Sequence, residues 1–294
     1  MRIFYILVSL FAIILWGIAL LATRILIDNN FPLNFITISR FAIASLLLRL
    51  SLKKSNIQEI KKNDRIYFLF MAAGGISLFY FFENSGVKYT TISNTSLIIA
   101  TIPLFTLLYA RLIHGKKLSW QNALGLPIGI IGTIILFLKD IQADNSIHFK
   151  GDLLVLGCVA FWVIYSFAYR KIMNKYNTIF ITYIITLWGT LFLLPTIFWE
   201  LPQIRTIILN KETIIAVLFL GIFPSYLAYL IWNFVISKIG LKITSNMVLF
   251  SPIVSIAVGI IWLNEPFTGN LIISTITIII GAFLTSHSQA GEEF

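Results

Sequence analysis

Residues 4–23 read FYILVSLFAIILWGIALLAT, twenty positions without a charged side chain. About 20 apolar residues at 1.5 Å per residue are what a helix needs to cross the hydrocarbon core of a bilayer. The apolar core of a signal peptide is shorter, about 7–15 residues, so we interpret this stretch as a retained first helix. Because only helices or closed barrels satisfy every backbone hydrogen bond in lipid, the stretch also limits the fold of the rest of the chain.

Nine more apolar stretches follow, and the ten divide into two sets of five. The first set is predicted at residues 4–23, 32–50, 66–86, 91–113 and 120–138, and the second at 152–171, 179–198, 213–237, 243–263 and 270–286. Since five is odd, the second set enters the membrane from the opposite side, which is the inverted repeat of many secondary transporters. We therefore predict an all-α integral membrane protein with ten transmembrane helices. One repeat occupies residues 1–140 and the other residues 150–294.

Composition and charge agree with a membrane protein and disfavour other classes. Apolar residues make up 58% of the chain and charged residues 12%, against about 25% charged residues in soluble domains. The net charge of +10 does not predict nucleic-acid binding, because no segment between the apolar stretches is long enough to form a basic folded face. The single cysteine, Cys158, excludes an intrachain disulfide. We find no metal-ligand cluster, nucleophile motif or phosphate loop, so we expect no cofactor and no enzyme.

The loop charges predict the orientation. Thirteen Lys and Arg residues follow even-numbered spans and six follow odd-numbered spans. Since cytoplasmic loops carry the excess of Lys and Arg, we expect both termini in the cytoplasm.

The repeat is also visible in individual residues. Trp16 is followed eight positions later by Arg24, and Trp162 is followed at the same distance by Arg170. Three further pairs share a single offset of 149 residues: Pro103 and Pro252, Lys116 and Glu265, and Gly132 and Gly281. A constant offset across three pairs indicates duplication.

Five segments carry a family resemblance. They are ILWGIALLATR (14–24), NSGVKYTTISNTSLIIATIPLF (84–105), GIIGTIIL (129–136), SPIVSIAVGIIWLNEPF (251–267) and IIIGAFL (278–284). With them the chain resembles the drug/metabolite transporter superfamily, specifically proteins built of two EamA domains, over nearly its whole length. The resemblance implies an inner-membrane carrier, often an exporter of amino acids or related amphipathic solutes, that does not use ATP. The glutamate of the family after the fourth span stands here as Glu265 in the second repeat, but as Lys116 in the first.

Two tryptophans are placed at an unusual depth. Trp16 and Trp162 each lie about 12 residues into their spans, roughly 18 Å deep at the helical rise. Tryptophan ordinarily favours the interface, where its N–H meets water. We therefore predict that both line a solute site between the repeats, where repeat symmetry places it. The alternative is packing in the core, with each N–H bonded to a neighbouring helix.

Arg40 and Glu83 are the charged candidates inside the spans. Arginine within a span costs at least ~2.5 kcal/mol, so Arg40 should face the bundle interior. Glu83 lies within ~7 Å of it in depth at the helical rise. We predict an ion pair, or a substrate carboxylate that competes with Glu83 for Arg40. The alternative has Arg40 snorkelling outward with Glu83 at the interface. Glu83 is also our candidate for proton coupling, because few other acids approach the membrane interior.

Further polar residues and two prolines complete the candidate site. Polar side chains in spans either line a cavity or join helices, at about 0.6 kcal/mol each. Mid-span prolines remove a helix hydrogen bond and produce fixed kinks or moving hinges. We expect Glu265 to anchor a helix end or loop. The other candidates for substrate binding are Tyr80, Asn94, Tyr226, Tyr229, Asn233 and Asn246, and the kink candidates are Pro103 and Pro252.

The first functional prediction is a secondary transporter that exports amino acids or related solutes by alternating access. We expect a monomer or homodimer in the lipid bilayer, with protons as the possible coupling ion. An importer of a nucleotide-derived metabolite and a broad drug exporter are the alternatives within this class. A membrane enzyme acting on lipid head groups is the alternative from another class, but it would need acids or histidines clustered near one interface, and none cluster in this sequence.

Overall fold

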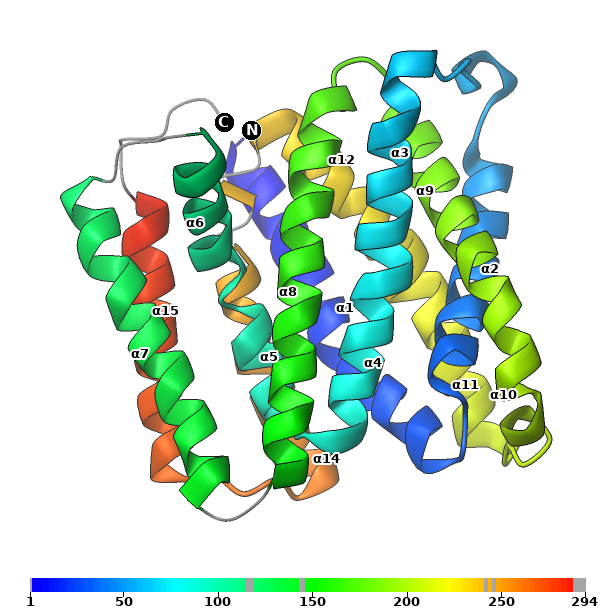
Figure 1. The fold of residues 1–294 in the computed structure, drawn as a ribbon. Coiled ribbons are helices and arrows are strands. Elements are labelled where there is room, and N and C mark those ends of the chain that lie inside the picture. Colours follow the sequence, from blue (N-terminus) through cyan, green and yellow to red (C-terminus); the bar gives the residue numbers. More distant parts are fainter. Residues whose placement is uncertain (1, 115–118, 143–145, 241–242, 245–246, 288–294) are drawn as a thin grey trace.

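The computed structural model describes residues 2–114, 119–142, 146–240, 243–244 and 247–287. These residues form an all-α bundle (Figure 1). Eight helical segments are long and apolar enough to cross a membrane, and two shorter apolar helices, Val248–Leu263 and Gly269–Thr285, complete the set. The prediction of ten membrane helices is confirmed.

Two spans of the first repeat are interrupted, the third by a π-helical segment and the fourth by a break between two helices. The repeat consists of α1 (Arg2–Asp28), α2 (Leu33–Ser51), α3 (Arg65–Ala72), a π-helical segment (Ala73–Leu78), α4 (Phe79–Tyr89), α5 (Ile92–Ile99), α6 (Ile102–His114) and α7 (Trp120–Gln142). Two 3₁₀ turns, Lys54–Asn56 and Lys62–Asp64, join α2 to α3.

The second repeat has matching interruptions. It consists of α8 (Ser146–Ile172), α9 (Thr178–Leu193), a 3₁₀ turn (Leu194–Thr196), α10 (Ile197–Ile204), α11 (Lys211–Leu220), a π-helical segment (Gly221–Ala228), α12 (Tyr229–Ile239), a 3₁₀ turn (Val248–Phe250), α14 (Ser251–Leu263) and α15 (Gly269–His287). A π-helical segment therefore interrupts the third span of each repeat.

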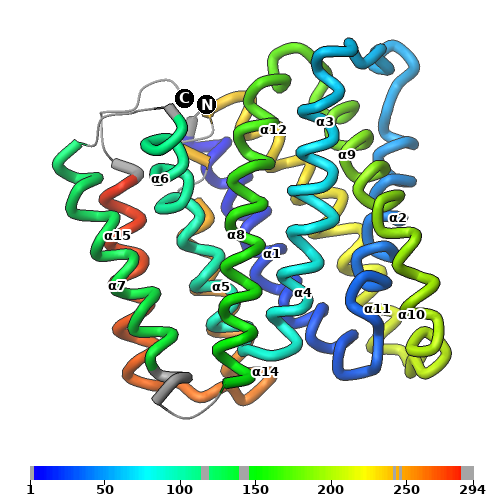
Figure 2. The backbone as a smooth tube through the Cα atoms, viewed as in Figure 1, coloured from blue at the N-terminus to red at the C-terminus, as the bar shows by residue number. Residues whose placement is uncertain are grey.

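The two repeats run in opposite directions and complete each other. Figure 1 shows α1 running from the top of the bundle to the bottom and α8 running from the bottom to the top. In Figure 2, α1 begins and α15 ends at the same end of the bundle. Contacts cross between the repeats in matching pairs: α1 packs on α11, α12 and α14, α8 packs on α3, α4 and α5, α2 packs on α9, and α7 packs on α15. The predicted inverted repeat is confirmed.

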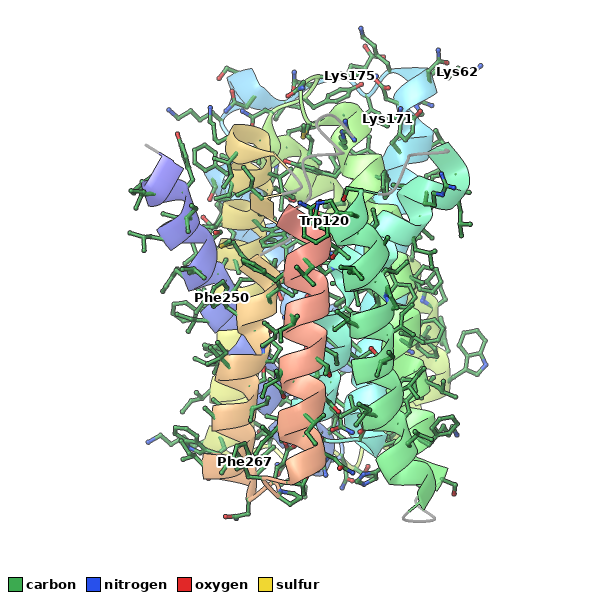
Figure 3. The ribbon with its side chains drawn as sticks, turned by 90° about the vertical axis from the view of Figure 1, so that its left-hand side faces the viewer. Lys62, Trp120, Lys171, Lys175, Phe250 and Phe267 are labelled. Atoms are coloured by element: carbon green, nitrogen blue, oxygen red, sulfur yellow. The ribbon has the colours of Figure 1, made fainter. Side chains whose placement is uncertain are left out.

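The surface of the bundle suits lipid. Large apolar side chains point outward along the outer helices, including Ile273, Ile276 and Phe283 of α15, each about half exposed. Figure 3 shows Lys62, Lys171 and Lys175 at one end of the bundle. An apolar belt that ends at a basic rim is the surface expected of a membrane protein.

Loop contacts join the repeats at the basic end. Lys175 lies after α8, and its Nζ is 2.7 Å from Asp64 Oδ1. The Tyr176 hydroxyl donates to the other Asp64 oxygen at 2.9 Å. The hydrogen bond to Asp64 raises the pKa of Lys175, and burial raises the pKa of Tyr176. At the opposite end Glu200 of α10 accepts two backbone N–H groups in the first turn of α2, at 3.0 and 2.9 Å.

Several span boundaries differ from the sequence prediction. The sixth span begins at Ser146 rather than at residue 152, and the seventh continues to Ile204 through its 3₁₀ turn. Pro103 lies in the first turn of α6, after α5 has ended. Pro252 lies in the first turn of α14, after the 3₁₀ turn at Val248–Phe250. The first turn tolerates proline because its N–H groups have no partner in the helix, so both spans divide at these positions.

Glycines bring α7 and α15 into backbone contact. A Cβ atom at Gly281 of α15 would meet the backbone N and Cα of Gly129 and lie 2.7 Å from the carbonyl oxygen of Gly125. Small residues at such crossings allow the close approach on which helix association in lipid depends.

We expect Gly281→Ala to destabilise the purified protein by about 1–3 kcal/mol, because the added methyl group forces two backbones apart. The measurement is thermal unfolding in detergent, where the melting temperature should fall by several degrees. Gly269→Ala is the matched control on the same helix, because nothing lies within 4 Å of a Cβ at that position. Equal melting temperatures for the two variants would contradict the packing argument.

Candidate functional site

A cavity lies between the two repeats. It is bounded by residues of α1, α2, α4, α5, α6, α8 and α14 and of the 3₁₀ turn before α14. The space open to the centres of water molecules is about 50 Å³, whereas one water needs roughly 10–15 Å³. The cavity therefore has room for water in this conformation. Five of the predicted site residues line it: Trp16, Arg40, Tyr80, Glu83 and Trp162.

The two predicted tryptophans form an aromatic wall. The rings of Trp16 and Trp162 meet edge to face, with centroids 5.7 Å apart. Phe79 lies 5.1 Å from Trp162 on the other side. The Trp16 Nε1–H donates to the carbonyl oxygen of Pro224 at 3.1 Å. Edge-to-face pairs stabilise a wall of this kind by about 0.5–1.5 kcal/mol each beyond burial. Trp16 thus both lines the cavity and bonds to a neighbouring helix.

Arg40 is fully enclosed, with 1% of its surface exposed. Its Nε donates to Ser225 Oγ at 2.6 Å, and its guanidinium carbon lies 4.5 Å from the centre of the Tyr80 ring. Its Nη2 is buried without a hydrogen-bond partner. A buried donor without a partner costs about 1–3 kcal/mol, more when it is charged. The guanidinium is therefore incompletely satisfied at the cavity wall.

The predicted ion pair between Arg40 and Glu83 is wrong for this conformation. Among the described residues, side-chain ion pairs within 4 Å join Arg24 to Asp28 and Lys175 to Asp64. Arg40 instead uses a neutral hydroxyl of the second repeat. The snorkelling alternative is also wrong, because the side chain is enclosed on all sides.

Glu83 faces the same cavity from α4 and is 8% exposed. No described residue lies within hydrogen-bond distance of its carboxylate. The π-helical segment just before α4 inserts an extra residue into the turn, which rotates the helix face that follows by about one residue. This rotation contributes to where Tyr80 and Glu83 point. The cavity thus holds one cation and one acid that do not touch.

Asn233 and Tyr229 join helices and do not line the cavity. Asn233 accepts a hydrogen bond from Tyr165 at 2.6 Å and donates to Thr182 at 2.9 Å. Tyr229 donates to the carbonyl oxygen of Gly75 at 2.8 Å. Both side chains are fully buried. Both were predicted to bind substrate, and in this conformation they form hydrogen bonds between helices instead.

Tyr226 and Asn94 also join helices. The Tyr226 hydroxyl lies 2.8 Å from that of Ser51, at the end of α2. Asn94 donates to a carboxylate oxygen of Asp152 at 3.2 Å, which ties α5 to α8. Asn246, another predicted substrate-binding residue, lies outside the described residues.

Glu265 anchors a helix end, as predicted. It accepts the backbone N–H groups of Ile92 and Ser93, at 2.7 and 3.1 Å, and the Ser93 hydroxyl. These groups form the N-terminus of α5, where a carboxylate is favoured by the helix dipole. The contact links the two repeats at the end of the bundle away from the basic rim. Lys116, at the equivalent position of the first repeat, lies outside the described residues.

Sequence reasoning missed two residues of the site. Ser225 holds Arg40, and the Trp232 ring packs 5.1 Å from Trp16 with its Nε1 unpartnered. Both lie in or just after the π-helical segment of the second repeat. Gly221 and Pro224 were the features of the sequence that could have predicted an irregular helix there.

The chain matches the model of the EamA-like transporter family twice, over residues 3–138 and 149–287. A relative from Archaeoglobus fulgidus, named an uncharacterized transporter, is 25% identical and covers 92% of this chain and 94% of its own. A probable terminal-alkyne amino-acid exporter from Streptantibioticus cattleyicolor is 21% identical and covers 86% of this chain and 83% of its own. YoaV of Bacillus subtilis, also named an uncharacterized transporter, is 25% identical with 93% of each chain covered.

The fold is similar to that of a solved protein. A crystal structure superposes with a TM-score of 0.69 at 19% identity, covering 96% of this chain and 98% of the other. This likeness concerns the arrangement of the helices alone.

We expect Asn233→Leu to destabilise the protein and Glu83→Gln to leave its stability nearly unchanged. Asn233 loses two buried hydrogen bonds to other helices, which costs about 1–3 kcal/mol for each partner left unsatisfied. Glu83→Gln keeps the side-chain shape at a position without a hydrogen bond to any described residue. Thermal unfolding of both variants in the same detergent measures the difference. A larger loss of stability for Glu83→Gln would contradict these placements.

Proposed function

Because the chain belongs to the EamA-like transporter family, we propose that it is a secondary carrier of small amphipathic metabolites that bear a carboxylate, amino acids first. The observation that carries this proposal is Arg40. Arg40 lines a cavity together with aromatic residues, and one of its guanidinium nitrogens is buried without a hydrogen-bond partner. Arginine binds carboxylates through paired, charge-assisted hydrogen bonds.

The rest of the cavity suits an amino acid. Glu83 supplies an acceptor for an ammonium group, and Trp16, Trp162 and Phe79 supply apolar surface for the body of the solute. Aromatic rings also attract an ammonium over their faces. The amino-acid exporter named among the relatives supports the same substrate class at 21% identity.

Alternating access follows from the repeat geometry. The cavity is too small for a metabolite in this conformation, since ligand pockets usually enclose about 300–1,000 Å³. The repeats must therefore part to admit a solute, as inverted repeats do around a site at the membrane middle. We propose export as the direction and Glu83 as the group that exchanges a proton. We place the boundary between the repeats in residues 140–150.

We expect Arg40→Gln to reduce transport of carboxylate solutes at least tenfold and to affect their amides far less, because the variant removes the charge that recognises the carboxylate. The measurement is uptake into liposomes of labelled phenylalanine and phenylalaninamide, with protein orientation and amount matched. Trp120→Phe is the control, because this exposed tryptophan lies on the outside of α7. Equal loss of both solutes would argue against carboxylate recognition.

The proposed orientation has both termini in the cytoplasm of a bacterial inner membrane. We expect a cysteine at Lys53 to react with an impermeant maleimide only from the cytoplasmic side, and a cysteine at Phe267 only from the outside. Both positions are exposed, and Figure 3 shows Phe267 at the end opposite the basic rim. The native Cys158 is buried, so unsubstituted protein serves as the unlabelled control. Labelling of the two positions from the same side would contradict the fold itself.

A further inference from the structure

Ser225 occupies an unusual place in the bundle. It lies in the π-helical segment Gly221–Ala228 of the second repeat and is fully buried. Its hydroxyl oxygen accepts the Nε–H of Arg40, which belongs to the first repeat. The residue before it, Pro224, offers its carbonyl oxygen to Trp16. Two adjacent residues of one repeat therefore hold two cavity side chains of the other.

The bond to Ser225 decides which part of the guanidinium is available. A guanidinium has five N–H donors in a fixed plane. Ser225 uses the Nε donor, and the guanidinium carbon lies over the Tyr80 ring at 4.5 Å from its centre. These two contacts restrict the position of the group. The Nη end is left as the part with an unsatisfied donor.

We propose that Ser225 is the positioning residue for the carboxylate of the substrate. It holds Arg40 so that the Nη end is presented to the ligand, and without it the side chain would lose its fixed orientation. Recognition groups bind more tightly when their geometry is set before the ligand arrives, because less freedom is lost on binding. This proposal rests on the proposed function and names a residue on which its carboxylate site depends.

The proposed affinity for the carboxylate also depends on the conformation of the two repeats. Arg40 and Ser225 lie on opposite repeats, so their bond exists only while α2 contacts the π-helical segment of the second repeat, as it does here. When the repeats part, Arg40 loses its fixed orientation and holds the carboxylate less tightly. A ligand that prefers one conformation shifts the population toward it. The same bond therefore links binding of the carboxylate to the conformation of the repeats.

The test uses the full-length protein purified in detergent, with benzoate as probe and benzamide as its neutral counterpart. Benzoate joins a carboxylate to an aromatic ring, and a ligand that binds the folded state raises the melting temperature in proportion to its affinity. Titration of the melting temperature yields a dissociation constant for each variant. We expect wild-type protein to bind benzoate but not benzamide, and Arg40→Gln to bind neither.

Ser225→Ala should raise the dissociation constant for benzoate at least fivefold, and Ser225→Thr, which keeps the hydroxyl, should stay within about twofold of wild type. Ser77→Ala is the matched control. Ser77 is a buried serine of the other π-helical segment whose hydroxyl bonds the carbonyl oxygen of Gly189, so this variant should bind benzoate as wild type does. Ser225→Cys, a near-isosteric weak acceptor, replaces Ser225→Ala if that variant fails to fold.

Wild-type affinity in Ser225→Ala, or in Ser225→Cys where that variant replaces it, would overturn the positioning role. An equal loss in Ser77→Ala, or the absence of benzoate-specific binding by wild-type protein, would overturn it as well. If the positioning role fails while Arg40→Gln still loses carboxylate uptake, the proposed function stands alone. If liposomes take up no carboxylate while benzoate binding still depends on Ser225, the positioning role stands and the proposed function fails.

Discussion

The whole bundle depends on one constraint, that lipid offers no hydrogen-bond partner to the backbone. A π-helical segment departs from the regular hydrogen-bond ladder, and this protein has one such segment in the third span of each repeat. Each segment receives a donor from the opposite repeat. Trp16 of the first repeat donates to Pro224, and Tyr229 of the second repeat donates to Gly75. Each irregular segment is therefore bonded to the opposite repeat, and the same contacts bring the repeats together beside the cavity.

Because irregular backbone at membrane depth must be buried in protein or line a cavity, the site and the irregularities occur together. Tyr80 and Glu83 follow one π-helical segment directly, and Ser225 lies within the other. Arg40 is placed where the second segment can satisfy part of its guanidinium. One guanidinium nitrogen of Arg40 remains a buried donor without a hydrogen-bond partner, which is costly. The π-helical segment therefore satisfies only part of this group.

Hydropathy was sufficient to predict the ten spans, because it depends on composition summed over long stretches. Their inversion followed from the odd number of spans in each repeat. The depth of Trp16, Arg40 and Glu83 in the membrane was sufficient to predict that they line one site, since depth follows from the helical rise. The sequence could not predict how each helix is rotated about its own axis, and therefore which side chains face the cavity. The π-helical segments change that rotation, so Tyr229 and Asn233 were expected at the cavity and instead bond to other helices. For the same reason the hydroxyl that holds Arg40 was not foreseen.

Duplication produced a symmetric scaffold with an asymmetric site. Glu83 lines the cavity, whereas Asn233, which lies 150 positions later in the third span of the second repeat, is neutral and bonded to other helices. Arg40 likewise has no charged counterpart in α9, the corresponding helix of the second repeat, which contains no charged side chain. A second set of charges would double the cost of taking ions out of water. The first repeat therefore supplies the charged groups, and the second supplies the neutral contacts, Ser225 above all, that hold them in place.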